Sequence, residues 1–471
     1  MSISASDTPR KRFTTIVLVV LIILAALAGG AYYLAPRFER AAPRIKLPDA
    51  EVLGLAPVQI RISDQGTGLK SVTATLSVGG SQVTLVSEQY ARPVAERTFT
   101  VDLSSKLGRG VEGPAVLRVS AQDGSLWKFP HGNQTVVQKN LAIDLTPPAV
   151  ELVAGDRYVN FGGAGVITYK ASADAVSSGV RIGGRLFPGV RGQVKDYPDR
   201  LVAFFAHPYD APADAKAALV ATDKAGNSSE IPLAYTLKHV KYRKSTIRIS
   251  DNFVQKVTHL LGDPGKRQGT PKEIFLRINK NLRKENEDRI AAITGKFTPL
   301  VLWRGVFRQL SNSKVEANFA DYRTYIYDNE PIDNAYHLGY DLSVTKHYPV
   351  EAANSGKVAF AGDLGIYGNA IILDHGLGLY TLYGHMSSID VHVGDTIGQG
   401  QLMGKTGQTG LAAGDHLHYG VYLHGVAVLP VEWWDPKWIR DNVEPKLGRP
   451  SGEANAQQSN APRMPARGQR R

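Results

Sequence analysis

The sequence predicts a mainly β protein: one N-terminal transmembrane helix, two β-sandwiches, a short helical connector and a C-terminal antiparallel-β domain. Three observations lead to this prediction. An uncharged apolar run occupies residues 13–35. Apolar and polar residues alternate along much of 45–236 and recur in short runs over 297–445, as expected of strands with one buried face. Between these regions, residues 239–296 place apolar side chains at helical spacing.

Composition excludes several kinds of site. The chain has no cysteine, which rules out disulfides, thiolate zinc ligands and a cysteine nucleophile. Its 471 residues suggest about three domains. The net charge of +12 favours an anionic partner. Because no nucleic-acid-binding motif accompanies it, we expect a membrane surface or a cell-wall polymer rather than nucleic acid; charge that serves solubility alone remains the alternative.

The apolar run at 13–35 is interpreted as an uncleaved transmembrane anchor. As a helix it would span roughly 35 Å, enough to cross a hydrocarbon core of about 30 Å. The basic triplet 10–12 precedes it, so residues 1–12 should be cytoplasmic and the rest exported. Basic residues at 37, 40, 44 and 46 weaken this signal. A signal peptide cleaved near Ala26-Leu27-Ala28 is the rival interpretation.

Residues 45–146 and 147–238 are each predicted to form a β-sandwich. Val72, Ala74, Leu76 and Val78 alternate with polar residues. A weak repeat supports two copies: the segment 119–124 (VSAQDG) resembles 220–226 (VATDKAG), a period of about 100 residues that suits one sandwich per copy. The Asp-Lys-Ala-Gly-Asn turn at 223–227 is similar to turns that end bacterial Ig-like modules, so both copies are predicted to be Ig-like.

Residues 239–296 are predicted to be a helical connector between β domains. Ser250 is a candidate N-cap for one helix, and Thr270 and Glu273 make a capping box for another, with Pro271 at its first position. Whether the segment 240–330 reaches the functional cleft stays open from sequence alone.

Residues 297–445 should form the last β domain, with strands at 350–360, 369–373, 379–383 and 418–423 separated by glycines. The remaining residues, 446–471, are rich in Pro, Gln, Asn and Arg. We therefore predict a disordered basic tail there.

A group of histidines in the last β domain indicates a metal site. His416 and His418 open a predicted strand, where alternate residues share a face. His337 and Asp341 are four residues apart, which would again share a face on a strand. Imidazole and carboxylate suit Zn²⁺, and three such ligands would leave a fourth position for water. No His-Glu-x-x-His motif supplies a glutamate base, so an uncoordinated histidine such as His385 is the candidate proton acceptor.

These motifs, taken together, resemble those of the lysostaphin-like (LytM-type) zinc metalloendopeptidases. That pattern is His-x-x-x-Asp, then a strand-end His after Tyr-x, then Gly-Asp-His-Leu-His. The chain shows the three parts at residues 337–341, 383–385 and 414–418. Shorter matches lie between them, among them Gly356-Lys357-Val358, Tyr367-Gly368-Asn369 and Asp374-His375-Gly376. The resemblance covers about residues 331–436.

The resemblance implies that His337, Asp341 and His418 bind zinc and that His385 and His416 are the catalytic pair. It further implies a LytM-type peptidase domain at 297–445 that cleaves peptide cross-links of peptidoglycan. In that scheme His416 takes a proton from water, and His385 helps to stabilise the oxyanion. The anchor would place the protein in the cell envelope, held in the cytoplasmic membrane with its catalytic domain outside.

Two other functions compete with this one. Some proteins of this family lack metal ligands and activate cell-wall amidases without being enzymes themselves. The intact set of five residues in this chain favours an enzyme. The Ig-like modules would make the protein mainly a binding or spacer molecule if their strands exposed aromatic rows, and no such rows are evident in the sequence.

Overall fold

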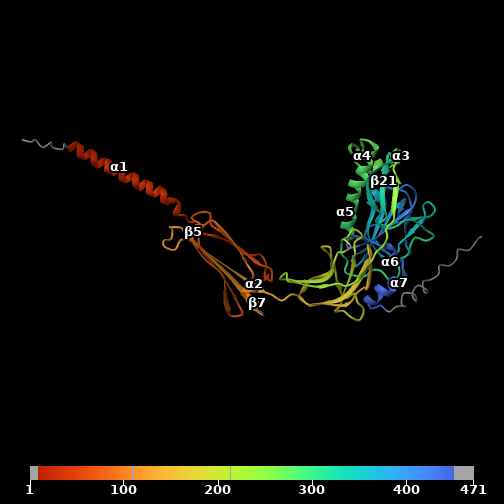
Figure 1. The fold of residues 1–471 in the computed structure, drawn as a ribbon, viewed down its shortest axis with the longest axis horizontal. Helices are drawn as coiled ribbons and strands as arrows, with labels where there is room; N and C mark the ends of the chain where they lie inside the picture. The colour runs from red at the N-terminus through yellow and green to blue at the C-terminus, as the bar shows by residue number, and fades with distance from the viewer. Residues whose placement is uncertain (1–8, 109–110, 213, 450–471) are drawn as a thin grey trace, which may run out of the picture. The chain divides into compact units, whose positions relative to one another are not determined.

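The computed structural model describes residues 9–108, 111–212 and 214–449 (Figure 1). The chain divides into two compact units: residues 1–148 with 222–228, and residues 149–221 with 229–471. The protein is mainly β, as predicted, with one long apolar helix at the N-terminal end.

The N-terminal helix α1 (Pro9–Leu34) continues into a 3-10 turn, η1 (Ala35–Arg37). Within the described part of the chain it is the one helix long and apolar enough to cross a membrane. Its side chains from Phe13 to Leu34 are exposed. This is the surface expected of a segment whose apolar side chains meet lipid rather than protein.

The rest of the first unit is built from two mainly antiparallel sheets over one core. Ile60 and Ile62 from one sheet pack with Val72, Leu76 and Leu117 from the other. The larger sheet has the order β2 (Val52–Leu53), β8 (Gln134–Ile143), β7 (Gly113–Asp123), β4 (Leu69–Val78) and β5 (Ser81–Val94). The smaller has the order β1 (Arg44–Lys46), β3 (Val58–Ser63) and β6 (Glu96–Val101), followed by α2 (Leu103–Lys106). The β2–β8 pair is parallel. A two-sheet sandwich is consistent with the predicted Ig-like module.

The second unit begins with two four-stranded sheets that also share a core. One has the order β14 (Val190–Arg191), β15 (Leu201–Ala206), β11 (Ala164–Ala171) and β9 (Val150–Ala154). The other has the order β13 (Arg185–Pro188), β12 (Ala175–Ile182), β16 (Ala217–Asp223) and β17 (Ser228–Pro232). A parallel pair, β10 (Tyr158–Asn160) and β18 (Thr236–Lys238), lies beside them.

The weak sequence repeat has a local structural counterpart. Asp123 ends β7 and Asp223 ends β16, and both are buried. Asp123 accepts hydrogen bonds from the backbone and side-chain amides of Asn133, and Asp223 does the same with Asn227. Buried carboxylates need such donors, so the two copies close the end of a strand in the same way.

The C-terminal domain is organised by an eight-stranded sheet. Its order is β20 (Lys314–Ala317), β23 (Tyr340–Ser343), β31 (Leu417–Leu423), β27 (Leu379–Met386), β26 (Asn369–Gly376), β25 (Gly356–Asp363) and β29 (Thr396–Ile397), and β32 (Val426–Val428) pairs with β31. Two three-stranded sheets accompany it: β24 (Pro349–Glu351), β30 (Leu402–Lys405) and β28 (Ser388–Ile389); and β19 (Lys244–Arg248), β21 (Tyr322–Tyr327) and β22 (Glu330–Tyr336).

The strand predicted at 350–360 is wrong as a single element. Its first residues pair with β30 as β24, whereas β25 pairs with β26 in the main sheet. Asn354 sits in the break, where its side-chain oxygen accepts a hydrogen bond from the Ser355 amide. Because the apolar run continues through the break, its pattern did not reveal that the chain changes sheets.

The helices of residues 251–294 begin where the sequence predicts. Ser250 caps α3 (Asp251–Val257), and Thr270 and Glu273 form a complete capping box at α4 (Pro271–Leu276). The chain continues through a π-helical segment, η4 (Arg277–Leu282), into α5 (Arg283–Thr294). Two 3-10 turns, η2 (Thr258–Leu260) and η3 (Pro264–Arg267), join α3 to α4.

This helical segment is more than a connector. Phe275, Ile278 and Ile290 are buried in the same core as Tyr367 and Tyr380 of the C-terminal domain. The 3-10 turn η5 (Gly365–Tyr367) is part of this contact, since its Ile366 amide donates to Asn286 of α5. The apolar stripe that the sequence revealed is therefore buried against the C-terminal domain.

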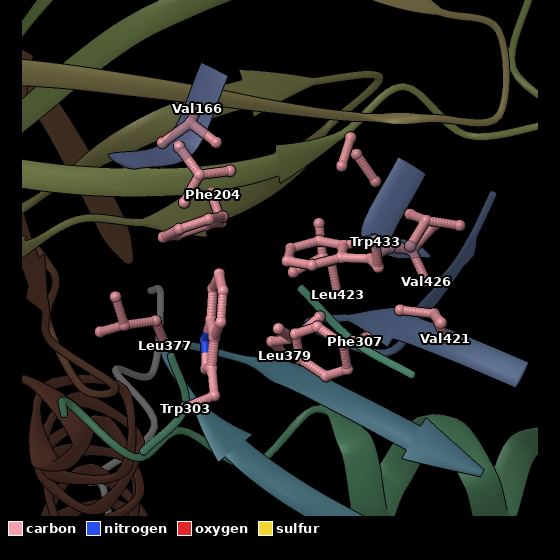
Figure 2. Packing of buried hydrophobic residues seen from close by; sticks show 14 of the residues in the cluster. Val166, Phe204, Trp303, Phe307, Leu377, Leu379, Val421, Leu423, Val426 and Trp433 are labelled. Atoms are coloured by element: carbon pink, nitrogen blue, oxygen red, sulfur yellow. The ribbon is translucent and has the colours of Figure 1, made fainter. Parts of the chain in front are cut away.

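A second shared core joins the sheets of residues 150–232 to the C-terminal domain. Figure 2 shows Phe204 of β15 above Trp303, with Trp433 beside them. The rings of Phe204 and Trp433 are stacked with centroids 6.2 Å apart, and Trp303 meets Trp433 edge-on at 5.7 Å. Aromatic packing of this kind, over a fully buried Trp433, makes one continuous hydrophobic body.

Polar links reinforce this contact. Trp433 lies in α6 (Pro430–Trp434), which leads through α7 (Pro436–Trp438) and η6 (Ile439–Val443) to η7 (Glu444–Leu447). Lys446 pairs with Asp156, and both side chains are buried. The predicted disordered tail therefore starts too early: Lys446 and Leu447 are packed. Residues 450–471, the remainder of that predicted tail, lie outside the described residues.

The buried Glu432 gives this contact a pH dependence. Burial raises the pKa of Glu432 from 4.5 to about 8, although its carboxyl accepts hydrogen bonds from Asn160 and the Ala164 amide. Above about pH 4.5 the unfolded state therefore binds fewer protons than the folded state. The free energy of unfolding should fall as pH rises from about 4.5 to about 8, by on the order of 1.4 kcal/mol per unit.

Comparison with Glu432→Gln isolates this effect. We expect denaturant unfolding to show the wild type losing stability relative to the variant between about pH 5 and about pH 8. Parallel stability curves for the two proteins would contradict this assignment.

Candidate metal centre and catalytic site

Strand pairing places two of the predicted ligands side by side. Asp341 of β23 lies directly opposite His418 of β31, and Gly384 of β27 lies opposite His418 on the other side. Side chains at opposed positions of antiparallel strands lie on the same face of the sheet. His418 thus faces Asp341 across one pair of strands and has no side chain opposite it across the other.

His337 reaches the same point from a loop. It lies between β22 and β23, so the predicted shared strand face with Asp341 is wrong, although the two side chains do meet. The turn requires Gly339: a Cβ there would lie 2.6 Å from His418 Nε2 and 2.6 Å from the Tyr419 carbonyl oxygen. Close approach of the turn to the His418 ring, rather than strand alternation, brings His337 to Asp341.

Three potential ligand atoms converge. His337 Nε2 lies 2.9 Å from Asp341 Oδ1 and 3.0 Å from His418 Nδ1, and His418 Nδ1 lies 3.1 Å from Asp341 Oδ1. These are the three residues expected to bind metal, and they form one of the two groups of potential ligands found among the described residues. The second group, Glu39 with Asp64 and Asp123, belongs to the first unit.

The hydrogen bonds of His337 fit a cation at this point. Its Nδ1 lies 3.0 Å from the Asn318 carbonyl oxygen, which only accepts, so Nδ1 carries the hydrogen. In the neutral ring Nε2 then presents a lone pair to Asp341 Oδ1, which is also an acceptor. A cation between these atoms would turn that repulsion into coordination, and two imidazole nitrogens with one carboxylate oxygen suit zinc.

Burial at His418 and the neighbouring histidines at Asp341 favour the protonation states of these two residues that a metal needs. Burial lowers the pKa of His418 to about 4, so its ring is neutral at physiological pH. Burial alone would raise the pKa of Asp341, but His337 and the other neighbouring histidines outweigh it and hold that pKa well below its usual value. Neutral imidazole and ionised carboxylate are the ligand forms of these residues.

The other two predicted residues, His385 and His416, lie beside this group. Their ring centroids are 4.7 Å apart, and His416 Nε2 is 3.5 Å from Asp341 Oδ1. His385 occupies a bulge where β27 shifts register against β26, and its φ of 61° is unusual for a residue with a side chain. The bulge is a local distortion of the kind that often lies next to active sites.

Backbone carbonyls orient both rings in the same way. His385 Nδ1 lies 2.8 Å from the Thr409 carbonyl oxygen, and His416 Nδ1 lies 2.9 Å from that of Gly414. Each Nδ1 therefore carries hydrogen, which leaves Nε2 of the neutral ring as an acceptor. His385 can donate to an oxyanion through Nε2 only after it has taken up a proton.

The two rings differ in how readily they become charged. Burial lowers the pKa of His385 well below its usual value. Burial has the same tendency at His416, but the hydrogen bond and charge of Asp341 outweigh it and raise the pKa of His416. The carboxylate thus makes His416 the more favourable of the two positions for a proton.

The five residues line one cleft of about 350 Å³. One wall is the part of the main sheet formed by β23, β31 and β27, which carry Asp341, His418 and His385. The facing wall comes from the segment 240–330, which answers the question left open by the sequence. Its contributions to the lining include Arg243, Ser245, Ile247, Phe253, Phe275, Arg283, Arg323 and Tyr325.

Sequence reasoning missed Arg323 of β21. Its Nη2 donates to Asp341 Oδ2 at 2.8 Å, the carboxylate oxygen that does not face His337 and His418. A carboxylate fixed in this way would offer a metal one oxygen in a set direction. Nothing in the local sequence indicates this role, because Arg323 and Asp341 belong to different sheets.

The remaining histidines of this domain lie outside the cluster. His375 is buried and bridges the Ser355 carbonyl and Thr381. His347 and His392 are exposed and lie near Ser387 and Asp395 respectively. His424 packs edge-on against Phe187. These contacts are those of structural or surface residues.

Comparison with known proteins now identifies this domain. The sequence pattern of Peptidase family M23 matches residues 335–430, which include all five site residues. Residues 335–430 form an M23 peptidase domain. The M23 domain thus coincides with the main sheet and the loops that carry the histidine cluster.

Three similar proteins each match about a fifth to a quarter of the chain. The DD-carboxypeptidase/endopeptidase Mpg of Neisseria meningitidis is 39% identical over 95 residues, 20% of this chain and 22% of that protein. The peptidoglycan DD-endopeptidase ShyA of Vibrio cholerae is 34% identical over 89 residues, 19% and 21% of the two chains. The solved catalytic domain of lysostaphin from Staphylococcus simulans is 30% identical, covers 26% of this chain and 94% of that one, and has a TM-score of 0.24. The chain therefore spans about a fifth of the length of the two curated relatives.

The space around Gly339 of the M23 domain can be tested directly. Gly339→Ala should push the His418 ring aside and weaken zinc binding by about tenfold or more, measured by competition with a chromogenic chelator. Gly398→Ala is the matched control, because a Cβ at 398 meets nothing within 4 Å. Wild-type zinc affinity in Gly339→Ala would contradict the proposed position of His418.

The contact between Arg323 and Asp341 yields a second test. Arg323→Gln replaces the charged guanidinium that fixes Asp341 by a shorter, neutral amide, so zinc affinity should fall by about tenfold, while Arg323→Lys should keep part of it through its remaining charge. The measurement is the same chelator competition at fixed pH. Tighter zinc binding in Arg323→Gln would instead mean that the arginine acts mainly through charge repulsion of the metal.

Proposed function

We propose that this protein is a membrane-anchored zinc metalloendopeptidase that hydrolyses peptide cross-links of peptidoglycan. The observation that carries the proposal is the convergence of His337, Asp341 and His418 at 2.9 to 3.1 Å beside the paired rings of His385 and His416. The cleft thus combines a set of potential zinc ligands with two further imidazoles. Three protein ligands, which leave a fourth position open, are the pattern of a catalytic rather than a structural zinc site.

In this proposal His337 Nε2, Asp341 Oδ1 and His418 Nδ1 hold the zinc. When bound, zinc acts as a Lewis acid that polarises a carbonyl and lowers the pKa of water toward about 7. Arg323 and the Asn318 carbonyl hold Asp341 and His337 in position. Gly339 leaves room for the His418 ring.

His416 is assigned as the proton acceptor. Its Nε2 is unprotonated in the neutral ring, and Asp341 at 3.5 Å stabilises the imidazolium that forms. The proton held at His416 Nε2 is then available for the leaving amine. His385, whose Nδ1 donates to the Thr409 carbonyl, accepts a hydrogen bond at Nε2 that orients water or the substrate amide. Burial lowers its pKa, which disfavours the role of oxyanion donor that the resemblance implies.

The proposed substrate, peptidoglycan, is supported by the names of two relatives and by the apolar helix and positive charge of this chain. One relative, ShyA, is named a peptidoglycan DD-endopeptidase, and another, Mpg, is named a DD-carboxypeptidase/endopeptidase. The apolar helix α1 supports a location at the cell envelope, and the excess positive charge of the chain suits an anionic wall polymer. In this proposal α1 stays in the cytoplasmic membrane and the catalytic domain lies outside the cytoplasm.

Substitution at the site separates metal binding from proton transfer. His385→Ala and His416→Ala should keep their zinc while hydrolysis of purified peptidoglycan falls by roughly 10²–10⁴-fold. Asp341→Ala and His418→Ala should lose both. Elemental analysis gives the metal content, and mass spectrometry of the released fragments identifies the bond cleaved.

His392→Ala is the matched control, because this histidine is exposed and outside the cleft; it should behave as wild type. Full activity of zinc-loaded His416→Ala would show that another group accepts the proton. If wild-type protein binds zinc, releases no fragments from peptidoglycan and stimulates a cell-wall amidase, the protein is an activator and the proposed enzyme is wrong.

A further inference from the structure

We propose that the loop of residues 124–132 docks on the anionic phospholipid headgroup layer of the membrane that α1 spans. This inference rests on the membrane anchoring in the proposed function and concerns the first unit only. The loop connects β7 and β8. It carries Trp127 and Phe129, both exposed, on either side of Lys128.

Hydrogen bonds tie this loop to the chain just after α1. The Leu126 amide donates to the Arg37 carbonyl at 2.7 Å, and Ser125 Oγ donates to the Glu39 carbonyl at 2.7 Å. Asn133, at the other end of the loop, donates its side-chain amide to the same Glu39 carbonyl at 3.1 Å. The position of the loop is therefore fixed relative to the exit of α1.

This places the loop at the depth of the headgroups. Arg37 ends a single 3-10 turn after Leu34, so its carbonyl lies roughly 6 Å beyond the end of the helix. The headgroup region on each side of a bilayer is of similar thickness, about 5–8 Å. A loop bonded to the Arg37 carbonyl thus lies within reach of that layer when α1 spans the membrane.

The exposed side chains suit a membrane interface. Phe129 is 77% exposed, more than any other large apolar residue of the described chain outside α1, and Trp127 is 45% exposed. Tyr32 and Tyr33 lie at the end of α1 and are exposed as well. Aromatic residues concentrate at the boundary between lipid and water, where an apolar ring and a polar edge are both accommodated.

The charge of this surface is positive. Arg37, Arg40 and Lys128 are exposed, and the Arg40 guanidinium lies 4.1 Å from the centre of the Trp127 ring. The acids of this region, Glu39, Asp64 and Asp123, are turned inward: Glu39 accepts hydrogen bonds from the amide and hydroxyl of Thr67, and Asp64 and Asp123 are buried. Cations beside exposed aromatic rings match phospholipid phosphates and the acyl boundary below them.

The absence of cysteine allows a site-specific test with the full chain. His131→Cys, labelled with a fluorophore, reports on the loop without removing Trp127, Lys128 or Phe129. The chain is reconstituted in vesicles of phosphatidylcholine and phosphatidylglycerol that contain a brominated lipid. We expect the bromines to quench the label, and the change of Trp127 and Phe129 to Ser in this background to abolish the quenching.

Ser81→Cys is the matched control. Ser81 is the first residue of β5, just after the turn that follows β4. The other end of β4 lies near the loop. Ten residues of β4, about 33 Å of strand, therefore separate Ser81 from the loop. A label there should show no quenching. Equal quenching at both positions would overturn the proposal. Quenching at position 131 that changes with the density of protein in the vesicles would mean that a second copy of the protein covers the loop, and would overturn it as well.

Carbonate extraction of the same vesicles distinguishes failure of the proposed anchoring by α1 from failure of the proposed docking of the loop. Protein that is extracted shows that α1 does not span the bilayer, so the proposed anchoring has failed. Protein that resists extraction while the label at 131 stays unquenched shows that anchoring holds and the docking loop is wrong. Quenching in pure phosphatidylcholine as strong as in the mixed vesicles would overturn the preference for anionic lipid.

Discussion

The candidate site depends on the position of β31 between β23 and β27. That arrangement puts His418 opposite Asp341 on one side and opposite Gly384 on the other. A slip of one residue in either pairing would turn His418 to the opposite face of the sheet. The remaining features, the turn at Gly339 and the bulge at His385, bring the other rings to the place that this pairing defines.

Two shared cores hold this sheet in register. On one side, helices α4 and α5 bury Phe275 and Ile290 with Tyr367 and Tyr380. On the other, Trp433 joins the sheets of residues 150–232 to the M23 domain, with Glu432 and Lys446 satisfied by partners from that region. Elements outside the family motif are therefore part of the body that positions the site. Because a closely packed interior transmits strain, a shift in one of these elements would move the residues of the site. A metal site tolerates only small shifts of its ligands.

The sequence could specify residue types more reliably than the geometry that unites them. The quoted motifs contain all five residues that meet in the cleft, and the caps at Ser250 and Thr270 were readable because capping depends on neighbours only a few residues away. The shared strand face proposed for His337 and Asp341 was wrong, since the chain turns between them. The break at Asn354 was also hidden within a continuous apolar run.

By itself, the sequence determined the mainly β class, the apolar helix and the set of histidine and aspartate residues, because periodicity and motif are local properties of the chain. Only the tertiary structure decided that the helical segment forms a wall of the cleft and that Arg323 holds Asp341. The same holds for the contact of the 124–132 loop with the exit of α1. These contacts join residues from separate sheets, or from segments about 90 positions apart. Which residues meet in such contacts depends on how whole strands and helices pack. The spacing of residues within one segment therefore cannot predict these contacts.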